Sequence, residues 1–324
     1  MKKYMIMCMA LVAIVLSSCK NEEISIAREV RFEVRPYGVI ADFVKHQVYE
    51  DDLETFYASD MLRVNLFVYD NKGELVASDK QYLTGYRSTM NTTFDLADGE
   101  YTVIATSDVT TMHGGEVSFE YWEFSGINRL SDLRIKDLNY VGSDDKILGV
   151  SYETITVASG NVNYSIKLEP AGALFVVQHN GIHAFSDVVT YELDVNKSSD
   201  FCSFANGGFQ PIISEATTYN WKVDEIIVGN YPDYNNIYSY RFVLPLGNTD
   251  FEWLAILKEG YLYLDQTHNA VNIKQGKMYN CVFTIPSLTC EFYEFSEGKS
   301  MNVAGDLVRF RDTNKGSNLP TNVK

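Results

Sequence analysis

The chain is built from short runs in which apolar and polar residues strictly alternate. The clearest runs are Ile24–Arg35 and Leu62–Tyr69, and in the first of them Val30, Phe32 and Val34 share one parity. A period of two with one apolar face indicates a half-buried β-strand, because successive side chains of a strand point to opposite faces. The chain also contains 22 Tyr, 18 Phe and only 7 Pro, a composition that suits strands. The pattern therefore predicts an all-β fold.

The 324 residues are enough for two domains of ordinary size. Pro170-Ala171-Gly172 falls near the middle of the chain, between strand-like runs, and holds two residues that break regular structure. Many short strands separated by turn residues favour β-sandwiches. We predict two tandem β-sandwich domains, over residues 29–170 and 171–300, followed by a polar C-terminal tail over 301–324.

Three turn signals predict how neighbouring strands are joined. Asp70–Gly73 predicts a tight turn, since Gly73 can adopt a positive φ. Asp98-Gly99 lies between alternating runs and predicts a hairpin. Ser159-Gly160 is expected to join Ser151–Val157 and Val162–Leu168 as a strand pair. Elsewhere we expect one strand over 117–124, a short helix within 126–149 and a glycine-rich loop over 201–208.

The first 18 residues have the layout of a secretory signal peptide. Lys2 and Lys3 precede an apolar run over Met5–Leu16, and Ser17-Ser18-Cys19 follows. A run of about a dozen apolar residues is shorter than the roughly 20 that a transmembrane helix needs. Small residues before a cysteine resemble a bacterial lipobox, in which the leader is removed and the cysteine is lipidated.

We therefore predict a signal peptide over 1–18, lipidation of Cys19 and a lipid-anchored tether over 19–28. The alternative is a secreted protein with a chance cysteine near the cleavage point. The acidic stretch Lys20–Ile24 resembles the surface-export signal of some Gram-negative lipoproteins. The expected location is the outer face of the outer membrane.

Charge and motifs exclude several functions. The leader holds two of the 27 basic residues and none of the 43 acidic ones, so the mature chain carries a formal charge of −18. Such a chain repels phosphate backbones, and we expect no nucleic-acid partner. The sequence contains no Walker loop, dinucleotide-binding glycine motif, nucleophile elbow or zincin motif. We expect no catalytic residue, no cofactor and no enzymatic activity.

His179 and His183 have the spacing of two zinc ligands on a helix, but they flank Asn180-Gly181 at the end of a strand. That spacing does not converge side chains on a strand, so we expect no metal site. Of the cysteines beyond Cys19, a two-residue turn at Pro286-Ser287 would place Cys281 opposite Phe292 and not opposite Cys290. Free buried thiols are then expected for Cys281 and Cys290, since a disulfide between them would need a register shift.

Four motifs together resemble the fimbrillin superfamily of type V pili, including its anchor and minor-subunit branch. They are the lipobox at Cys19, the strand and turn Leu62–Gly73, the run Asp98–Ala105 and the late motif Gly276–Asn280. The resemblance covers most of residues 24–296 in layout. It implies transthyretin-like sandwiches and a structural or adhesive role in a pilus.

The resemblance also implies a mode of assembly. A trypsin-like protease of the outer membrane cuts such subunits after an Arg behind the first strand, and a strand from a neighbouring subunit fills the emptied groove. Here the first strand is Ile24–Arg35, which carries the candidate cleavage residues Arg28, Arg31 and Arg35. Alternatively, the three are ordinary polar residues of the strand. Anchor subunits keep the lipid and the first strand, and the polar tail with only Val308 and Phe310 favours an anchor or minor subunit.

The implied partners are the outer membrane, reached through the lipid, other fimbrial subunits, and a host or bacterial surface glycan or protein. The alternative function is a surface lipoprotein that binds glycans through exposed aromatic side chains. Trp122 and the pair Tyr231 and Tyr234 are its candidate platforms.

Overall fold

The computed structural model describes residues 27–36, 60–84, 88–138, 147–159, 162–181, 188–198, 201–204, 208–212, 217–223, 236–244, 247–257, 262–284, 289–294 and 306–307. Every regular element in these ranges is a β-strand, which confirms the all-β prediction. In the same ranges, no helix has the length and apolar character needed to cross a membrane.

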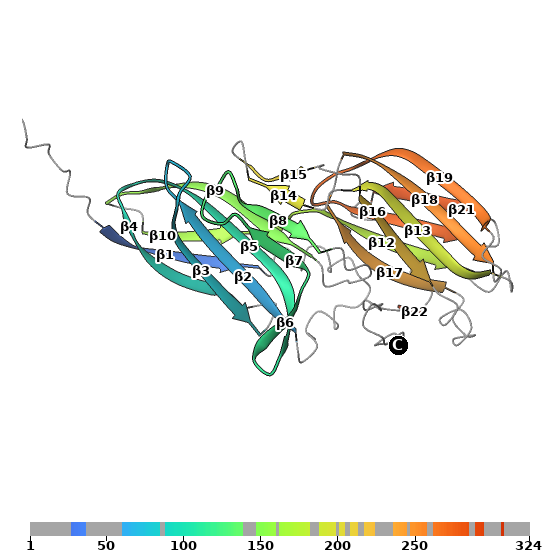
Figure 1. Cartoon of the computed structure of the whole chain (residues 1–324), viewed down its shortest axis with the longest axis horizontal. Coiled ribbons are helices and arrows are strands. Elements are labelled where there is room, and N and C mark those ends of the chain that lie inside the picture. Colours follow the sequence, from blue (N-terminus) through green and yellow to red (C-terminus); the bar gives the residue numbers. More distant parts are fainter. Residues whose placement is uncertain are drawn as a thin grey trace, which may run out of the picture.

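Most of the strands up to Pro170 form two sheets that face each other (Figure 1). The smaller sheet has the order β10-β1-β4, with bounds Asn163–Lys167, Ala27–Arg35 and Met90–Ala97. The larger sheet has the order β11-β9-β5-β2-β3, and β6 pairs with the far end of β5. Its strands span Glu169–Pro170, Gly149–Val157, Gly99–His113, Asp60–Tyr69 and Leu75–Leu83, and β6 spans Glu116–Glu120.

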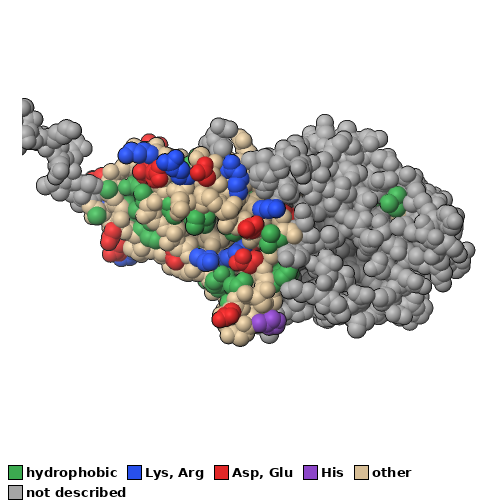
Figure 2. Space-filling view, in the orientation of Figure 1, with side chains coloured by type: hydrophobic (Ala, Val, Ile, Leu, Met, Phe, Trp, Pro, Cys, Tyr) green, Lys and Arg blue, Asp and Glu red, His purple; other side chains and the backbone are tan. Residues whose placement is uncertain are grey.

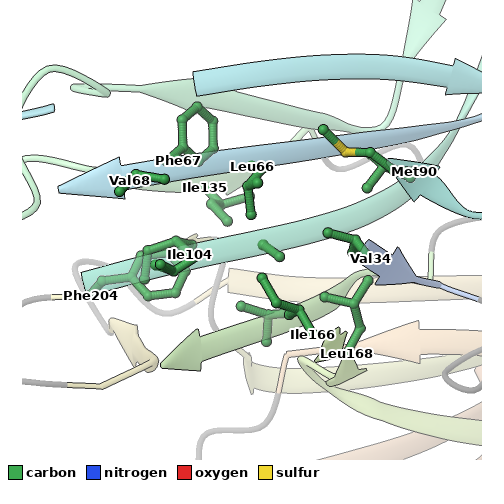
Figure 3. Packing of buried hydrophobic residues seen from close by; sticks show 14 of the residues in the cluster. Val34, Leu66, Phe67, Val68, Met90, Ile104, Ile135, Ile166, Leu168 and Phe204 are labelled. Atoms are coloured by element: carbon green, nitrogen blue, oxygen red, sulfur yellow. The ribbon is translucent and has the colours of Figure 1, made fainter. Parts of the chain in front are cut away.

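The space between these two sheets holds the inner core of the first half. Val34 of β1, Leu66 of β2 and Ile166 of β10 belong to one cluster of buried side chains, and Met90 and Leu168 lie near Val34 (Figure 3). Each fully buried side chain of this size contributes about 1.5–3 kcal/mol. The apolar parity read from the sequence is the parity that faces this core.

A third sheet accounts for the opposite face of β2. It has the order β15-β14-β8-β7, with bounds Gln210–Ile212, Phe201–Ser203, Arg134–Asp137 and Trp122–Ser125. Phe67 is buried on this side and its ring lies 6.4 Å from that of Phe124, while Tyr69 donates a hydrogen bond to the carbonyl of Ile127 at 2.9 Å. As a result β2 is buried on both faces.

Most of the strands after Gly172 form two further sheets. The first has the order β21-β20-β12-β17-β22, with bounds Thr289–Glu294, Met278–Thr284, Ala173–Asn180, Asn236–Val243 and Asp306–Leu307. The second has the order β16-β13-β18-β19, with bounds Thr217–Val223, Val188–Ser198, Gly247–Leu257 and Leu262–Ile273. The division into two domains stays a prediction.

The turn at Asp70 is confirmed. Its carboxylate accepts hydrogen bonds from the backbone amides of Lys72 and Glu74, both at 2.9 Å, and Gly73 adopts a φ of 76°. A side-chain oxygen that accepts from nearby backbone amides is typical of an Asx-turn. This arrangement explains the Asp at the start of the turn without a bound ion.

Two predicted strand pairs are wrong. The Asp98-Gly99 turn does not form a hairpin, because β4 pairs with β1 while β5 pairs with β2 and β9 in the other sheet. Likewise β10 pairs with β1 in parallel and not with β9. Both turns pass the chain from one layer of the sandwich to the other. Turn chemistry fixes where the chain reverses, but hydrogen-bond partners depend on which layers bury the apolar faces.

Three local predictions are also wrong. The expected single strand over 117–124 breaks at Tyr121 into β6 and β7, which lie in different sheets. The described part of 126–149, residues 126–138 and 147–149, contains no helix; there Arg134–Asp137 form strand β8, because it pairs with β7 on one side and with β14 on the other. Phe201–Ser203, expected in a loop, form strand β14. In each case tertiary pairing overrides the local signal.

Candidate functional site: the first strand and its groove

Strand β1 is the middle strand of the smaller sheet. On one edge it pairs antiparallel with β4 from Ala27 to Val34, and on the other it pairs in parallel with β10 from Arg31 to Arg35. The backbone amide of Arg31 also donates to the carbonyl of Val162 at 2.7 Å. Taking β1 away would therefore leave a slot between β4 and β10 with backbone groups exposed on both walls.

The inward side chains of β1 are buried in the core between the two sheets. Val30, Phe32 and Val34 are between 0 and 1% exposed. The ring of Phe32 lies 5.9 Å from that of Phe94 on β4 and 5.7 Å from that of Tyr164 on β10. The alternate side chains of β1 thus fill pockets lined by both neighbouring strands, which is the arrangement that strand addition uses.

The three arginines of β1 occupy two different settings. The side chain of Arg28 is on the inward parity at the end of the sandwich, where it binds both carboxylate oxygens of Asp98, one of them at 2.9 Å. This hydrogen bond raises the pKa of Arg28 and lowers the pKa of Asp98. Arg31 and Arg35 lie on the outward face, where they pair with glutamates of the same strand.

The exposure of Arg31 and Arg35 agrees with the interpretation that they are ordinary polar residues on the outward face of the strand. Their side chains are 67% and 64% exposed, and each pairs with the glutamate two positions earlier. On the face of the molecule that Figure 2 shows, acidic and basic side chains of the described residues are interspersed in the same way. Exposed pairs of this kind contribute little to stability.

Several predicted residues lie outside the described residues: Cys19, His183, Tyr231, Tyr234, Val308 and Phe310. His179 is described, and its buried ring stacks on that of Phe283 at 5.1 Å. No group of three or more His, Cys, Asp or Glu side chains that could hold a metal ion occurs within the part of the chain that the structure describes.

Two further predictions can be compared with the structure. Strand β20 pairs with β21 so that Cys281 lies opposite Phe292 and Cys290 lies opposite Phe283, which confirms the predicted register. Trp122 is fully buried, so it cannot serve as an exposed platform for a sugar ring. This removes one of the two aromatic platforms proposed for glycan binding.

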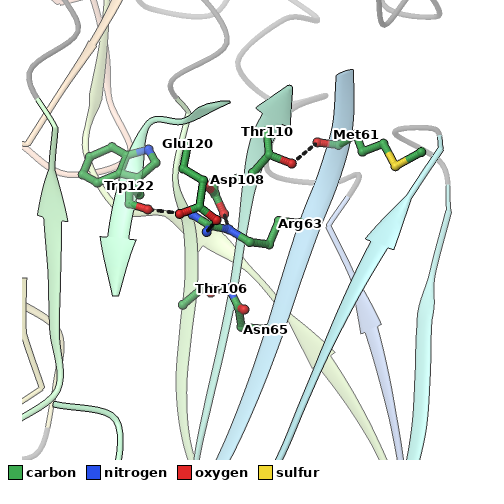
Figure 4. A network of polar contacts seen from close by, with 8 residues as sticks. All are labelled: Met61, Arg63, Asn65, Thr106, Asp108, Thr110, Glu120 and Trp122. Atoms are coloured by element: carbon green, nitrogen blue, oxygen red, sulfur yellow. Dashed lines mark hydrogen bonds and ion pairs between the residues drawn. The ribbon is translucent and has the colours of Figure 1, made fainter. Parts of the chain in front are cut away.

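A buried polar network lies beneath the third sheet, and sequence reasoning missed it (Figure 4). Arg63 of β2 is 3% exposed and donates to both carboxylate oxygens of Asp108 on β5, at 2.9 and 2.7 Å. It also donates to the carboxylate of Glu120 and, at 2.7 Å, to the carbonyl of Trp122. Its guanidinium lies 4.8 Å from the ring centre of Phe124.

Through this network, the side chain of Arg63 links four strands. Arg63 connects β2, β5, β6 and β7, and a second hydrogen bond joins Asn65 to Thr106 at 3.1 Å on the same face. Burial raises the pKa of Asp108 to about 6, although Arg63 opposes the shift. The available signal was Arg63 between the apolar residues Leu62 and Val64, but only the pairing of β2 with β5 places Arg63 opposite Asp108 and reveals the network.

Comparisons with known proteins give structural likeness only. No family model and no curated protein matches the sequence. Similar solved structures include a Bacteroides thetaiotaomicron protein described as polysaccharide-binding, with 13% identity and a TM-score of 0.49 over 83% of this chain and 99% of the other. The tip fimbrial protein Mfa3 of Porphyromonas gingivalis has 12% identity and a TM-score of 0.45 over 83% and 99% of the two chains. The fimbrial anchor protein Mfa2 of the same organism has 12% identity and a TM-score of 0.43 over 83% and 97%.

Proposed function

We propose that this chain is a surface lipoprotein of the outer membrane that acts as a fimbrillin-like structural or adhesive component of a type V pilus. Within the pilus we assign it to an anchor or minor subunit, which keeps its lipid and its first strand. The observation that carries the proposal is the position of β1, the first described strand after the predicted lipid site, in the centre of a sheet. Fimbrial and adhesin proteins also stand among the similar structures.

The proximity of the lipid site to β1 supports an anchor. Strand β1 begins at Ala27, so only residues 20–26 separate it from Cys19. A fully extended chain spans at most about 3.3–3.6 Å per residue, so this tether would hold the sandwich within about 25 Å of the lipid. A lipid with two or more chains would hold it there stably.

The pairing of β1 supports its retention. A trypsin-like protease binds its substrate as an extended strand, which requires a free backbone edge. Arg31 is paired on both edges. Arg35 precedes Pro36, which has no amide hydrogen and a restricted backbone, and such a bond is a poor substrate. Cleavage at Arg31 would therefore require prior loss of the strand from the sheet, and the proline protects the bond after Arg35 whether or not the strand is paired.

Arg28 is the one arginine of the three that is neither paired on both edges nor followed by a proline. Its backbone is paired with β4 alone, because the pairing with β10 starts at Arg31. A cut after Arg28 would separate the lipid from the sandwich but leave Val30, Phe32 and Val34 in the groove. Such a cut would release the protein from the membrane without opening the groove to a donated strand.

The alternative of a glycan-binding surface lipoprotein rests on Tyr231 and Tyr234, which lie outside the described residues. The test of the leading proposal is the N-terminus and lipid status of the mature protein on intact cells, measured by mass spectrometry after surface shaving. A diacylglyceryl Cys19 still joined to Ala27–Arg35 is the expected result. A new N-terminus after Arg31 or Arg35 would mean that the strand is removed, and would refute retention.

A matched control separates lipidation from folding. Cys19→Ser should abolish labelling by a metabolic lipid probe while the purified body keeps the same thermal midpoint. Labelling that survives this substitution would overturn the lipid anchor. Co-purification of the wild-type chain with other pilus subunits, and loss of pili when the gene is deleted, would test the assignment to a pilus independently of the lipid.

A further inference from the structure

The second half of the chain supplies part of the first half's fold. Strand β14 (Phe201–Ser203) follows β13, yet it pairs antiparallel with β8 (Arg134–Asp137) in the sheet that covers the outer face of β2 and β5. Strand β15 (Gln210–Ile212) then pairs with β14 and forms the edge of that sheet. The chain thus returns across the predicted domain boundary at 170–172.

The side chains of this returning segment belong to the core of the first half. Cys202 and Phe204 are 0 and 1% exposed and lie within the same hydrophobic cluster as the strands of the first sandwich. The ring of Phe204 stacks on that of Tyr152 in β9, with centres 6.5 Å apart and planes within 9°. Figure 3 shows Phe204 close to Ile104 of β5.

The direct connection between the halves is equally tight. Strand β11 ends at Pro170 and β12 begins at Ala173, so only Ala171 and Gly172 lie between a strand of each half, and both are buried. The amide of Ala171 donates to the carbonyl of Leu148 at 2.8 Å. On the other side, Gly172 accepts from the amide of Gly276 at 2.8 Å, a contact with the second half.

We propose that strands β14 and β15 together with Phe204 lock the two halves into one cooperative unit that unfolds as a whole and has no hinge at residues 170–172. Domains joined by small polar contacts move relative to each other by default, but a large hydrophobic interface suppresses such motion. Here the fully buried ring of Phe204, from the second half, is packed in the core of the first half. The linker consists of only two residues, and both are buried and hydrogen-bonded. The protein would then act as a single rigid spacer.

Hydrogen exchange of the full mature chain in increasing urea tests this directly. In the wild-type protein, amides of β5 in the first half and β20 in the second should open in the same global transition. Phe204→Ala removes a fully buried ring and should speed exchange in both strands by the same factor, about 100-fold or more. Val76→Ala, at a side chain 47% exposed, should change neither strand.

The proposal is overturned if β5 and β20 open at different urea concentrations in the wild-type protein. It is also overturned if Phe204→Ala speeds exchange in β5 while β20 keeps its wild-type rate. Should Phe204→Ala fail to fold, Phe204→Leu provides a smaller perturbation of the same contact with the same two readouts. None of these outcomes depends on whether the protein belongs to a pilus.

Discussion

Removing one partner of the buried Arg63–Asp108 pair should destabilise the protein far more than replacing both. In Asp108→Leu, Arg63 loses two hydrogen bonds, at 2.9 and 2.7 Å, while its side chain stays 4% exposed. Hydrogen bonds to charged groups contribute about 1.5–3 kcal/mol each, and an uncompensated buried charge costs about 3–5 kcal/mol. We expect a loss of about 3–5 kcal/mol, a large part of the 5–15 kcal/mol typical of a folded protein.

The double variant Arg63→Met/Asp108→Leu is expected to lie within about 1–2 kcal/mol of the wild type, since an apolar pair of similar volume often replaces a buried ion pair without loss. The assay is equilibrium urea unfolding at pH 7, followed by tryptophan fluorescence, to which Trp122, whose carbonyl accepts from Arg63, contributes together with two other tryptophans. The four proteins of the cycle yield the coupling energy between the two side chains.

Two results would contradict this reasoning. If Asp108→Leu costs less than about 1 kcal/mol, then Glu120 and the carbonyl of Trp122 suffice to stabilise Arg63. If the effects of the two single variants simply add in the double variant, the bidentate contact contributes no coupling. In either case the Arg63–Asp108 pair would contribute little to the free energy of unfolding.

Three further outcomes are expected. Burial raises the pKa of Asp108 from 3.8 to about 6, so the folded state binds the proton of this carboxyl more tightly than the unfolded state does. The resulting stabilisation is fully present below pH 4 and declines by about 3 kcal/mol as the pH rises to 6. Urea unfolding of wild type and Asp108→Asn at pH 4 and 7 would reveal this difference, and parallel pH profiles would exclude it. Gly126→Ala should cost about 3 kcal/mol or more in thermal unfolding, since Gly126 has a φ of 64° and an added Cβ would lie 2.0 Å from the carbonyl oxygen of Asp132. Arg28→Ala should leave the thermal midpoint nearly unchanged, because an exposed ion pair contributes little, and when trypsin is added to intact cells it should prevent release of the sandwich from its lipid; release that continues in this variant would place the trypsin cut elsewhere.

How far the sequence alone could go is clearest at β1. Strict alternation predicted the strand and its buried parity, and the structure places Val30, Phe32 and Val34 in the core as expected. The turn at Asp70 and the pairing of β20 with β21 were predictable for the same reason. Alternation and turn chemistry depend on residues that are close in the chain, and a single sequence displays them directly.

The candidate site itself was only half visible in the sequence. The composition of β1 marked it as a strand with three arginines, but its place between β4 and β10 could not be derived. That place decides that Arg31 is paired on both edges and Arg28 on one. The Arg63 network was hidden for a related reason, since the partners of Arg63 lie 45 or more residues away from it in sequence.

The sequence by itself determined the long alternating strands of this protein, such as β1 and β2, and which of their faces are apolar, because the pleat of a strand imposes a period of two on neighbouring residues. Only the tertiary structure decided which strands pair, that the turns at Asp98 and Ser159 change layers, and that Phe204 is buried in the first half. Many pairings satisfy the same local pattern. The one adopted is selected by how the layers together bury their apolar faces and satisfy their backbone hydrogen bonds, a property of the whole chain.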